Sequence, residues 1–588
     1  MIVRFMDRRT WLQLLGALAA ARPAMPQQRG GGAATPPPDG GRGGRGGGFP
    51  QRPMKITKEQ VEGALKIFGL EFEDKEIDMM LRGVNNNLYS YEELRKIEVP
   101  YDTEPAFTFY PGLPDRVPVK GPARFEPTIA KAASAKAPSD LEELAFWRVS
   151  DIAPLVRSRA VSATDLTKMY LSRMKKYSPK LLCLVTLTEE RALEQAAKAD
   201  QEIKAGRYRG PLHGIPFGVK DLFDTKGILT AWGAEPFEKR IPTADATVVD
   251  RLQNAGAVLT AKLSLGALAM GDQWYAGQTK SPWPTKAGRE KGEYDRGSSG
   301  SSAGSGSSTA AGLVGFSLGT ETLGSIISPS QACGTTSIRP TYGRVSRHGA
   351  MALSWTMDKI GPICRGVEDC ALVLNAIHGP DGHDRSVTTD ALNWEPHRPL
   401  KSLKVGVYKK GFDSARSEDD KKVYQQALAD LKNAGVEMTE VDYVEDLTGV
   451  RFLLDAEGAT AFDDITRNGE VRTLKQQGQG AWPNTFRTSQ LIPAVEYIRA
   501  QRARTLLVEK FEKFMADWDV VVIPPNSFLT TTNLTGNPQV ITKCGFVDGV
   551  PRSISFLGRI YEEGSPLRVA LAYEQATEWH KQNPTLLT

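Results

Sequence analysis

Along most of the chain, segments with an apolar residue at every third or fourth position alternate with short, continuously apolar segments. The first pattern predicts helices, including two over Ala244–Asn254 and Ser417–Ala434. The second pattern predicts buried strands, in chain order over Ala257–Ala261, Leu403–Tyr408, Val436–Val441 and Val520–Ile523. Such alternation indicates an α/β fold with buried, largely parallel strands.

Between residues 55 and 100 the pattern predicts small helices instead. Thr57 and Gln60 have the spacing of a capping box, and apolar residues follow at helical spacing up to Phe68. Two further helices are predicted over Lys75–Arg82 and Tyr91–Lys96.

A Pro-rich, extended stretch over residues 105–127 leads into the alternating region, which begins near Asp140. From there to Thr588 no linker-like break interrupts the pattern. We therefore expect a small helical and extended preface over residues 55–139 and one large domain over residues 140–588.

Composition and charge are those of a globular protein with a basic N-terminus. The 588 residues are 40% hydrophobic, which excludes a wholly disordered chain. The net charge is +5, but residues 1–53 contain eight Arg and two Asp and so carry +6 by themselves. Because the rest of the chain is nearly neutral, we expect no nucleic-acid partner.

The first 21 residues resemble an export signal. Arg4, Arg8 and Arg9 precede the apolar stretch Trp11–Ala21, and Arg8-Arg9-Thr10-Trp11-Leu12 is similar to the twin-arginine motif. We expect a periplasmic or other extracytoplasmic protein, with a cytoplasmic protein as the alternative. The stretch is too short to span a bilayer, so no transmembrane anchor is expected.

Residues 22–54 are rich in Gly, Pro and Arg, with ten Gly over residues 29–48. A segment of this composition buries too little apolar surface to offset its ordering entropy. We expect a disordered linker between the signal and the preface.

Cysteine and histidine usage argues against disulfide or metal chemistry. Five Cys in 588 residues are too few for a disulfide framework, and they form no paired C-x-x-C. The six His are scattered and form no H-E-x-x-H motif. We therefore expect neither a metal site nor another cofactor.

A Gly/Ser tract over Gly297–Ser308 has the composition of a flexible linker. Its surroundings argue otherwise, because it runs directly into the apolar, small-residue stretch that begins at Thr309. Small residues at this density let backbones approach closely and leave N–H groups free to face an oxyanion. This tract is the strongest candidate for a catalytic loop.

Four ordered motifs resemble the amidase signature family. The central one is the Gly/Ser block over Gly300–Pro329, and the upstream lysine motif is Gly214-Ile-Pro-Phe-Gly-Val-Lys220-Asp221. Arg339–Ser346 and the C-terminal Asn533–Pro538 also match. The resemblance covers residues of about 140–585 and implies a mixed, multi-stranded sheet surrounded by helices.

The resemblance also implies hydrolysis of carboxylic amides by a Ser-Ser-Lys triad. Ser325 would be the nucleophile, Ser301 the bridging serine, commonly preceded by a cis peptide bond, and Lys220 the base. A lysine acts as a base only if burial lowers its pKa from about 10.4, and the apolar neighbours of Lys220 would bury it. A Ser-His-Asp triad using His213 or His348 is conceivable, but the chain lacks a G-x-S-x-G elbow.

The oxyanion hole would be formed by the backbone N–H groups of Thr322, Leu323, Gly324 and Ser325. Leu323 stands where the family usually has Gly. We interpret this difference as a variation within the family. Glu321 replaces the more usual Asp, which keeps the charge.

Several neighbouring residues have secondary roles in this interpretation. Ser302 would support Ser301 by hydrogen bonding, and Met270 and Gly271 would line the substrate pocket. Lys262 is interpreted as a surface residue, and Arg344 as one that orders loops.

The sequence thus predicts an exported amidase that forms an acyl-enzyme with a small carboxylic, peptide-like or aryl amide. One alternative is the glutaminase subunit of a tRNA-dependent amidotransferase, and a second is a non-catalytic binding protein of the same fold. The sequence sets neither the oligomeric state nor the acyl and amine groups of the substrate.

Overall fold

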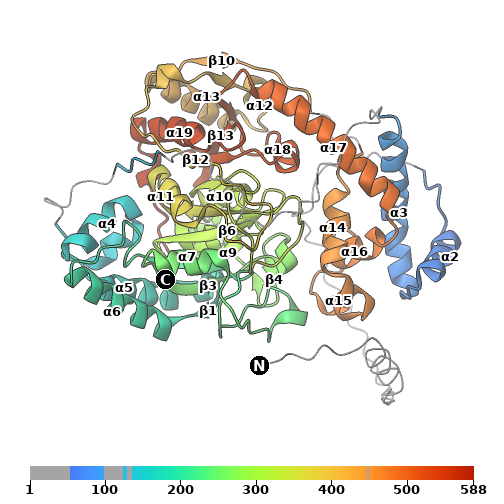
Figure 1. The fold of residues 1–588 in the computed structure, drawn as a ribbon, viewed down its shortest axis with the longest axis horizontal. Coiled ribbons are helices and arrows are strands. Elements are labelled where there is room, and N and C mark those ends of the chain that lie inside the picture. Colours follow the sequence, from blue (N-terminus) through green and yellow to red (C-terminus); the bar gives the residue numbers. More distant parts are fainter. Residues whose placement is uncertain (1–52, 98–106, 108–123, 129–135, 446–448, 588) are drawn as a thin grey trace, which may run out of the picture. The chain divides into compact units, whose positions relative to one another are not determined.

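In the computed structural model, the apolar segments form the strands of one eleven-stranded sheet (Figure 1). The structure describes residues 53–97, 107, 124–128, 136–445 and 449–587. The strands, in their order across the sheet, are β1 (Leu184–Leu187), β3 (Val258–Leu263), β2 (Pro216–Lys220), β6 (Phe316–Glu321), β8 (Lys359–Cys364), β7 (Thr336–Arg339), β12 (Gln539–Val547), β13 (Val550–Gly558), β11 (Val520–Ile523), β9 (Val405–Val407) and β10 (Met438–Glu440).

The sheet is mixed, as the family resemblance implies, and the expectation of largely parallel strands is wrong. β2 lies parallel to both β3 and β6, and β9 lies parallel to β11 and β10. The six other neighbouring pairs are antiparallel. The clearest exception to helix–strand alternation is the hairpin of β12 and β13, which turns at Asp548 and Gly549, both with positive φ.

Helices surround the sheet (Figure 1). The α-helices of the large domain are α4 (Val149–Ser158), α5 (Ala163–Leu181), α6 (Glu189–Lys204), α7 (Thr247–Asn254), α8 (Lys286–Lys291), α9 (Ala303–Ala310), α10 (Ile327–Cys333), α11 (Val367–Ile377), α12 (Lys409–Asp413), α13 (Glu418–Asn433), α14 (Leu453–Ala461), α15 (Asp463–Arg467), α16 (Trp482–Ser489), α17 (Ala494–Met515), α18 (Leu529–Thr535) and α19 (Gly564–Ala576). A two-stranded ribbon, β4 (Gln273–Trp274) and β5 (Gly277–Gln278), lies outside the large sheet.

The predicted elements of the large domain are present with small changes at their ends. The helix predicted to start at Ala244 starts at Thr247, whereas Ser417 is the N-cap of α13, as its side chain accepts a hydrogen bond from the amide of Asp420. β11 has the predicted bounds. The other predicted strands differ by one to three residues at their ends, the usual uncertainty of such boundaries.

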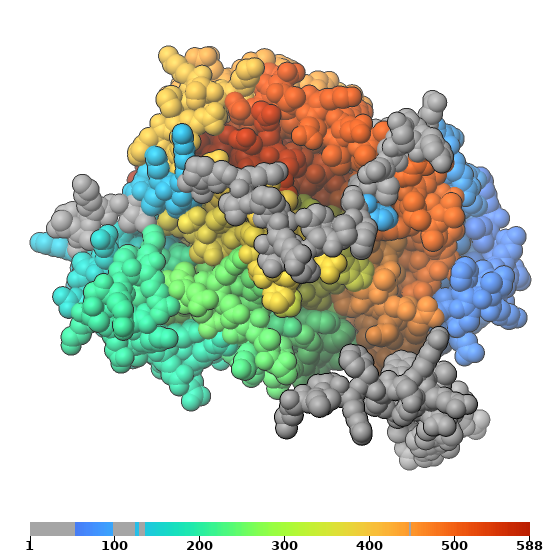
Figure 2. Space-filling view, in the orientation of Figure 1, coloured from blue at the N-terminus to red at the C-terminus, as the bar shows by residue number. Residues whose placement is uncertain are grey.

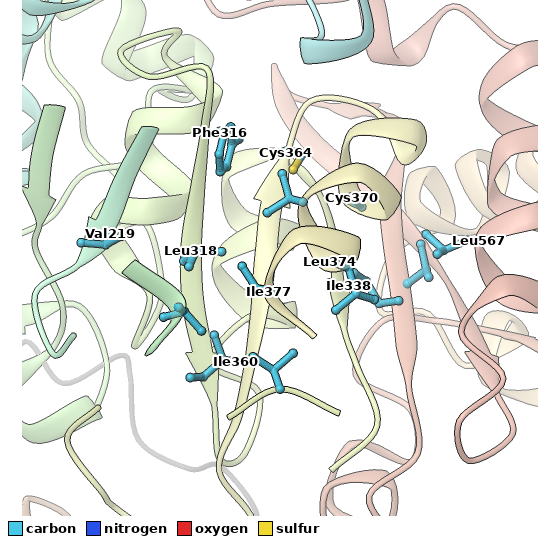
Figure 3. Packing of buried hydrophobic residues seen from close by; sticks show 14 of the residues in the cluster. Val219, Phe316, Leu318, Ile338, Ile360, Cys364, Cys370, Leu374, Ile377 and Leu567 are labelled. Carbon is cyan, nitrogen blue, oxygen red and sulfur yellow. The ribbon is translucent and has the colours of Figure 1, made fainter. Parts of the chain in front are cut away.

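The core lies between the central strands and the helices packed on them. Figure 3 shows Leu318 of β6, Ile360 of β8 and Ile338 of β7 near Leu374 and Ile377 of α11. These side chains are buried in the largest hydrophobic cluster. Packing on this face fixes β6 and β8, the two strands whose ends lead into the candidate site.

The preface has two helices rather than the three predicted. α2 (Lys58–Phe68) begins with the predicted capping box of Thr57 and Gln60. α3 spans Asp74–Leu94 without interruption, so the prediction of separate helices over 75–82 and 91–96 is wrong. Gly83, which weakens the helical pattern, lies against α16: a Cβ built there would come within 2.7 Å of Thr488. Tertiary packing outweighs its low helix propensity.

Buried ion pairs join α3 to the large domain. Oε1 of Glu76 lies 2.6 Å from Nη2 of Arg487 and 2.9 Å from Nε of Arg472. Glu76 and Arg487 are both buried. The preface is therefore packed onto the large domain through α3 rather than only connected to it along the chain.

Two predictions concern residues that the structure does not describe. The export signal over residues 1–21 lies outside the described residues, as does all of the predicted linker except residues 53 and 54. Among the helices in the described part of the chain, none has the length and apolar character needed to cross a membrane.

We predict that Glu76→Ala lowers the free energy of unfolding by about 3 kcal/mol, because it leaves the buried guanidinium of Arg487 without its carboxylate. Urea unfolding measures the change. Glu92→Ala on the same helix removes an exposed pair with Lys55 and should cost less than about 1 kcal/mol. Equal effects of the two substitutions would contradict the structural role of the Glu76 pair.

Candidate active site

Lys220 is the last residue of β2, and its side chain is completely buried. Its Nζ lies 2.8 Å from Oγ of Ser301 and 2.8 Å from Oγ1 of Thr320. β2 pairs with β6, which brings the lysine beside the end of the strand that carries Thr320. The structure thus brings Lys220 and Ser301 together, as predicted from the motifs.

Burial lowers the pKa of Lys220 to about 7, although the negative charges of Asp358 and Glu321 oppose the shift. Removing an ammonium group from water penalises its charged form. Near neutral pH a substantial fraction of this amine is therefore unprotonated and able to accept a proton.

The loop around Ser301 is held against β6 and the loop that follows it. The peptide bond between Gly300 and Ser301 is cis, as the family resemblance implies. The next residue, Ser302, donates from its amide to the carbonyl of Ser325 (3.1 Å). Its hydroxyl donates to the carbonyl of Thr320 and accepts from the amide of Thr320. The supporting position predicted for Ser302 agrees with these hydrogen bonds.

Ser325 lies in the loop between β6 and α10, and it is mostly buried. Within the described residues, the backbone N–H groups of Leu323, Gly324 and Ser325 have no hydrogen-bond acceptor. Gly324 has a φ of +89°, which a residue with a Cβ adopts only with strain. The loop thus presents unpaired donors beside a serine hydroxyl.

The carboxylate of Glu321 closes this loop. Its Oε2 accepts hydrogen bonds from the amides of Ile326 (2.8 Å) and Ile327 (2.9 Å), on the far side of Ser325. Its Oε1 accepts from Arg339 and from the side-chain amide of Asn533, each at 2.8 Å. Burial acts to raise the pKa of Glu321, but the charge and hydrogen bonds of Arg339 outweigh it and hold the pKa below its usual range.

A second buried carboxylate holds the other side of the loop. Asp358 accepts a hydrogen bond from Oγ1 of Thr322 (2.6 Å) and from the amides of Leu353 and Ser354. Burial raises the pKa of Asp358 despite these hydrogen bonds. Nothing in the spacing of the sequence pointed to Asp358, because it lies 33 residues after Ser325 and only the fold brings it to the loop.

Met270 and Gly271 lie against the backbone of the catalytic loop. A Cβ built on Gly300 would come within 1.8 Å of the carbonyl oxygen of Gly271. A Cβ on Gly266 would meet the carbonyl oxygens of Met270 and Gly271 at about 2 Å. The two glycines therefore allow close backbone contact, and a substrate-lining role for Met270 and Gly271 stays a prediction.

A cavity of about 340 Å³ opens beside the loop. It is lined by Leu222, Ala269, Thr320, Thr322, Arg347, His348, Ala350, Met351, Ala352, Leu353, Trp355, Asp358, Ile360, His383 and Asp384. Figure 2 shows that the yellow surface, which follows β8 in the chain, lies between the green surface and the orange and red surface of the C-terminal part. Thr320 and Thr322 connect the cavity to Lys220 and to the loop of unpaired donors.

The interpretation of Lys262 as a surface residue is wrong. Its side chain is completely buried on β3, and its Nζ lies 2.9 Å from Oδ1 of Asp221 and 2.6 Å from Oγ1 of Thr230. Asp221 also accepts a hydrogen bond from the amide of Ala231. The pair fixes the chain immediately after Lys220, and its charges explain how a lysine can be buried there.

The histidines do not form the alternative triad in the described structure. The ring of His213 is buried, accepts a hydrogen bond from the amide of Arg209 and lies 3.3 Å from Glu202. The ring of His348 stacks on His383. Arg344 orders loops, as predicted, because its guanidinium pairs with Glu563 at 2.7 Å and donates to two backbone carbonyls.

Comparison with known proteins decides the family. A family described as Amidase matches residues 165–544. The glutamyl-tRNA(Gln) amidotransferase of Heliobacterium modesticaldum has an A-type subunit that is 33% identical over 485 residues, which are 74% of this chain and 97% of that protein. The chain belongs to the amidase family.

Solved structures of the family have the same fold. The peptide amidase of Stenotrophomonas maltophilia is 27% identical, with a TM-score of 0.65 over 76% of this chain and all of that one. The corresponding A-type subunit from Thermotoga maritima, at 23% identity and a TM-score of 0.61, is similar in fold over 75% of this chain and 96% of that one. This amidase-family chain is thus an amide-hydrolysing enzyme with the large mixed sheet predicted from its motifs.

We predict that Glu321→Ala lowers the free energy of unfolding by about 3 kcal/mol or more, because the buried guanidinium of Arg339 loses its carboxylate and two amides lose their acceptor. Urea unfolding tests this. As a control, Glu437→Ala removes an exposed carboxylate and should change stability by less than about 0.5 kcal/mol. A Glu321→Ala protein as stable as the wild type would show that the loop is held by other contacts.

Proposed function

We propose that this enzyme hydrolyses its amide substrate with a Ser-Ser-Lys triad of Ser325, Ser301 and Lys220, through an acyl-enzyme. The observation that carries the proposal is a buried amine with a pKa of about 7 that lies 2.8 Å from the hydroxyl of Ser301. A serine hydroxyl is a poor nucleophile without a base, and a neutral lysine supplies one.

In the acylation step, Oγ of Ser325 attacks the amide carbonyl carbon. Ser325 gives its proton to Oγ of Ser301 as Ser301 gives its own to Nζ of neutral Lys220. The reverse relay then protonates the leaving nitrogen, the C–N bond breaks, and the amine departs. Water enters, gives a proton through the same relay, and its oxygen attacks the ester to release the carboxylic acid and restore Ser325.

The developing oxyanion would be bound by backbone N–H groups of Thr322, Leu323, Gly324 and Ser325. Support comes from the unpaired N–H groups of the last three residues. Each such donor is worth about 2.7–4 kcal/mol in comparable enzymes. The carboxylates of Glu321 and Asp358 would keep these donors in place before the substrate binds.

A second candidate is the glutaminase subunit of a tRNA-dependent amidotransferase. It is favoured by the curated relatives, since the A-type subunits from Heliobacterium modesticaldum and Geobacillus kaustophilus are each 33% identical over 74% of this chain. Under this candidate the substrate is glutamine, the product is ammonia, and other subunits stimulate the reaction. Efficient ammonia release from glutamine that a partner protein stimulates would support it.

A non-catalytic binding protein is the least supported candidate, because Lys220, Ser301 and the loop at Ser325 are assembled as the chemistry requires. Export through a twin-arginine signal stays a prediction that rests on residues 1–21 alone.

We predict that Ser325→Ala and Lys220→Ala each reduce amide hydrolysis by at least about 10³-fold, since both remove a member of one relay. A fluorophosphonate probe should label the wild type, should not label Ser325→Ala, and should label Lys220→Ala slowly. Ser328→Ala, three residues further along the same loop region, is the control and should be labelled like the wild type. Full turnover by Lys220→Ala would refute the proposed base.

We also predict that kcat/KM for an uncharged amide falls as the pH is lowered through about 7, approaching tenfold per pH unit. The sign follows because Lys220 must be unprotonated to accept a proton, and its pKa is about 7. A pH profile from 5 to 9 measures this. A profile with its midpoint near 10 would mean that the lysine keeps its ordinary pKa and that the buried base is incorrect.

A further inference from the structure

Most of the side chains that line the cavity are apolar. They are Leu222, Ala269, Ala350, Met351, Ala352, Leu353, Trp355 and Ile360. A volume of about 340 Å³ lies at the lower end of pockets that bind drug-sized molecules. The cavity is therefore large and apolar enough to take an aromatic or branched acyl group.

The charged side chains of the cavity are already committed to protein partners. Arg347 forms a two-pronged pair with Asp384, with Nε to Oδ2 at 2.8 Å and Nη2 to Oδ1 at 3.1 Å. Asp358 is occupied by Thr322 and by two backbone amides. A charged group of a substrate would have to displace one of these contacts.

The two histidines that line the cavity also contact each other. The rings of His348 and His383 stack with centroids 4.2 Å apart. Together with the paired charges, they leave the apolar side chains as the surface on which an acyl group can be buried without breaking a protein contact.

The loop that carries Trp355 is fixed from several directions. Its carbonyl accepts hydrogen bonds from the hydroxyl of Tyr342 and from Nη1 of Arg347. On both sides of it, Glu457 of α14 accepts from Oγ of Ser354 (2.7 Å) and from both the amide and the hydroxyl of Thr356.

α17 holds the same loop. Arg504 donates to the carbonyl and to the hydroxyl of Thr356, at 2.8 and 2.7 Å. Tyr497 donates to the carboxylate of Glu457 at 2.8 Å, and Gln501 donates to the same oxygen at 3.3 Å. The backbone on either side of Trp355 is thus held by two helices.

The indole of Trp355 is nonetheless 47% exposed while it lines the cavity. Large apolar side chains with a fixed backbone and free surface are the usual anchors of recognition, because little ordering entropy is lost on contact. Tryptophan offers both a large apolar face and favourable aromatic stacking.

From this arrangement we infer that the cavity binds an uncharged acyl group with an aromatic or bulky apolar end, and that Trp355 is the specificity-determining residue. This inference rests on the proposed amide hydrolysis at Ser325 and names the substrate class for it. Glutamine, whose α-ammonium and α-carboxylate groups both need charged partners, is a poor fit to this cavity.

The test compares kcat/KM for 3-phenylpropanamide, acetamide, succinamate and glutamine in the full chain. The wild type should prefer 3-phenylpropanamide to glutamine by at least about 100-fold, because recognition of a phenyl ring gains contacts that a charged group cannot make here. Trp355→Ala should lower kcat/KM for 3-phenylpropanamide about tenfold or more. It should leave acetamide within about threefold.

The control is Phe68→Ala, which removes an aromatic ring of similar exposure (56%) on the preface and should change none of these values. Fluorophosphonate labelling of Ser325 in Trp355→Ala should match the wild type, which shows that the variant is folded and its triad intact. Trp355→Phe should restore most of the preference for the aromatic substrate.

Failure of this inference differs from failure of the proposed function. A wild type that prefers glutamine or succinamate to the aromatic amide, yet is labelled at Ser325, would overturn the inference and leave the triad in place. An equal loss for acetamide and 3-phenylpropanamide in Trp355→Ala would also overturn it, because it indicates a structural role. A protein that neither hydrolyses an amide nor is labelled would refute the function itself.

Discussion

The buried carboxylate of Glu321 is the interaction on which the candidate site depends. It joins the end of β6 to the start of α10 through two amides, to β7 through Arg339 and to α18 through Asn533. These four parts of the chain lie up to 212 residues apart. Because a buried charge without partners is strongly unfavourable, the carboxylate is stable only when all of them are in place. The loop around Ser325 is therefore formed by the completed fold.

The same arrangement leaves Lys220 without a carboxylate of its own. Glu321 and Asp358 are near enough for their charges to act on the pKa of the lysine, but their oxygens are hydrogen-bonded to the loop and its surroundings. The amine contacts only hydroxyl oxygens among the hydrogen bonds described, those of Ser301 and Thr320. Lys262, by contrast, has Asp221 beside it and serves structure. Two buried lysines on neighbouring strands thus differ in the partner they are given.

How far the sequence could predict this molecule depended on the separation of the residues involved. Thr57 and Gln60, three residues apart, predicted the start of α2 correctly, and the motifs around Lys220 and Ser301 brought the right side chains together. The continuous helix α3 was missed because Gly83 owes its place to contact with Thr488, which lies about 400 residues later. Asp358 and the burial of Lys262 were missed for the same reason. Such contacts exist only in three dimensions.

The Gly/Ser tract has a consequence for how the protein meets proteases. Residues 301–320 are buried without exception, although their composition is that of a flexible linker. Proteases cut most readily where a segment of small, polar residues can leave the surface and extend across a binding cleft. Here such a segment forms α9 and β6 inside the sheet layers, so the part of the chain that would be easiest to digest when unfolded is among the best protected when folded. Resistance of this tract to digestion would report on the integrity of the reaction centre itself.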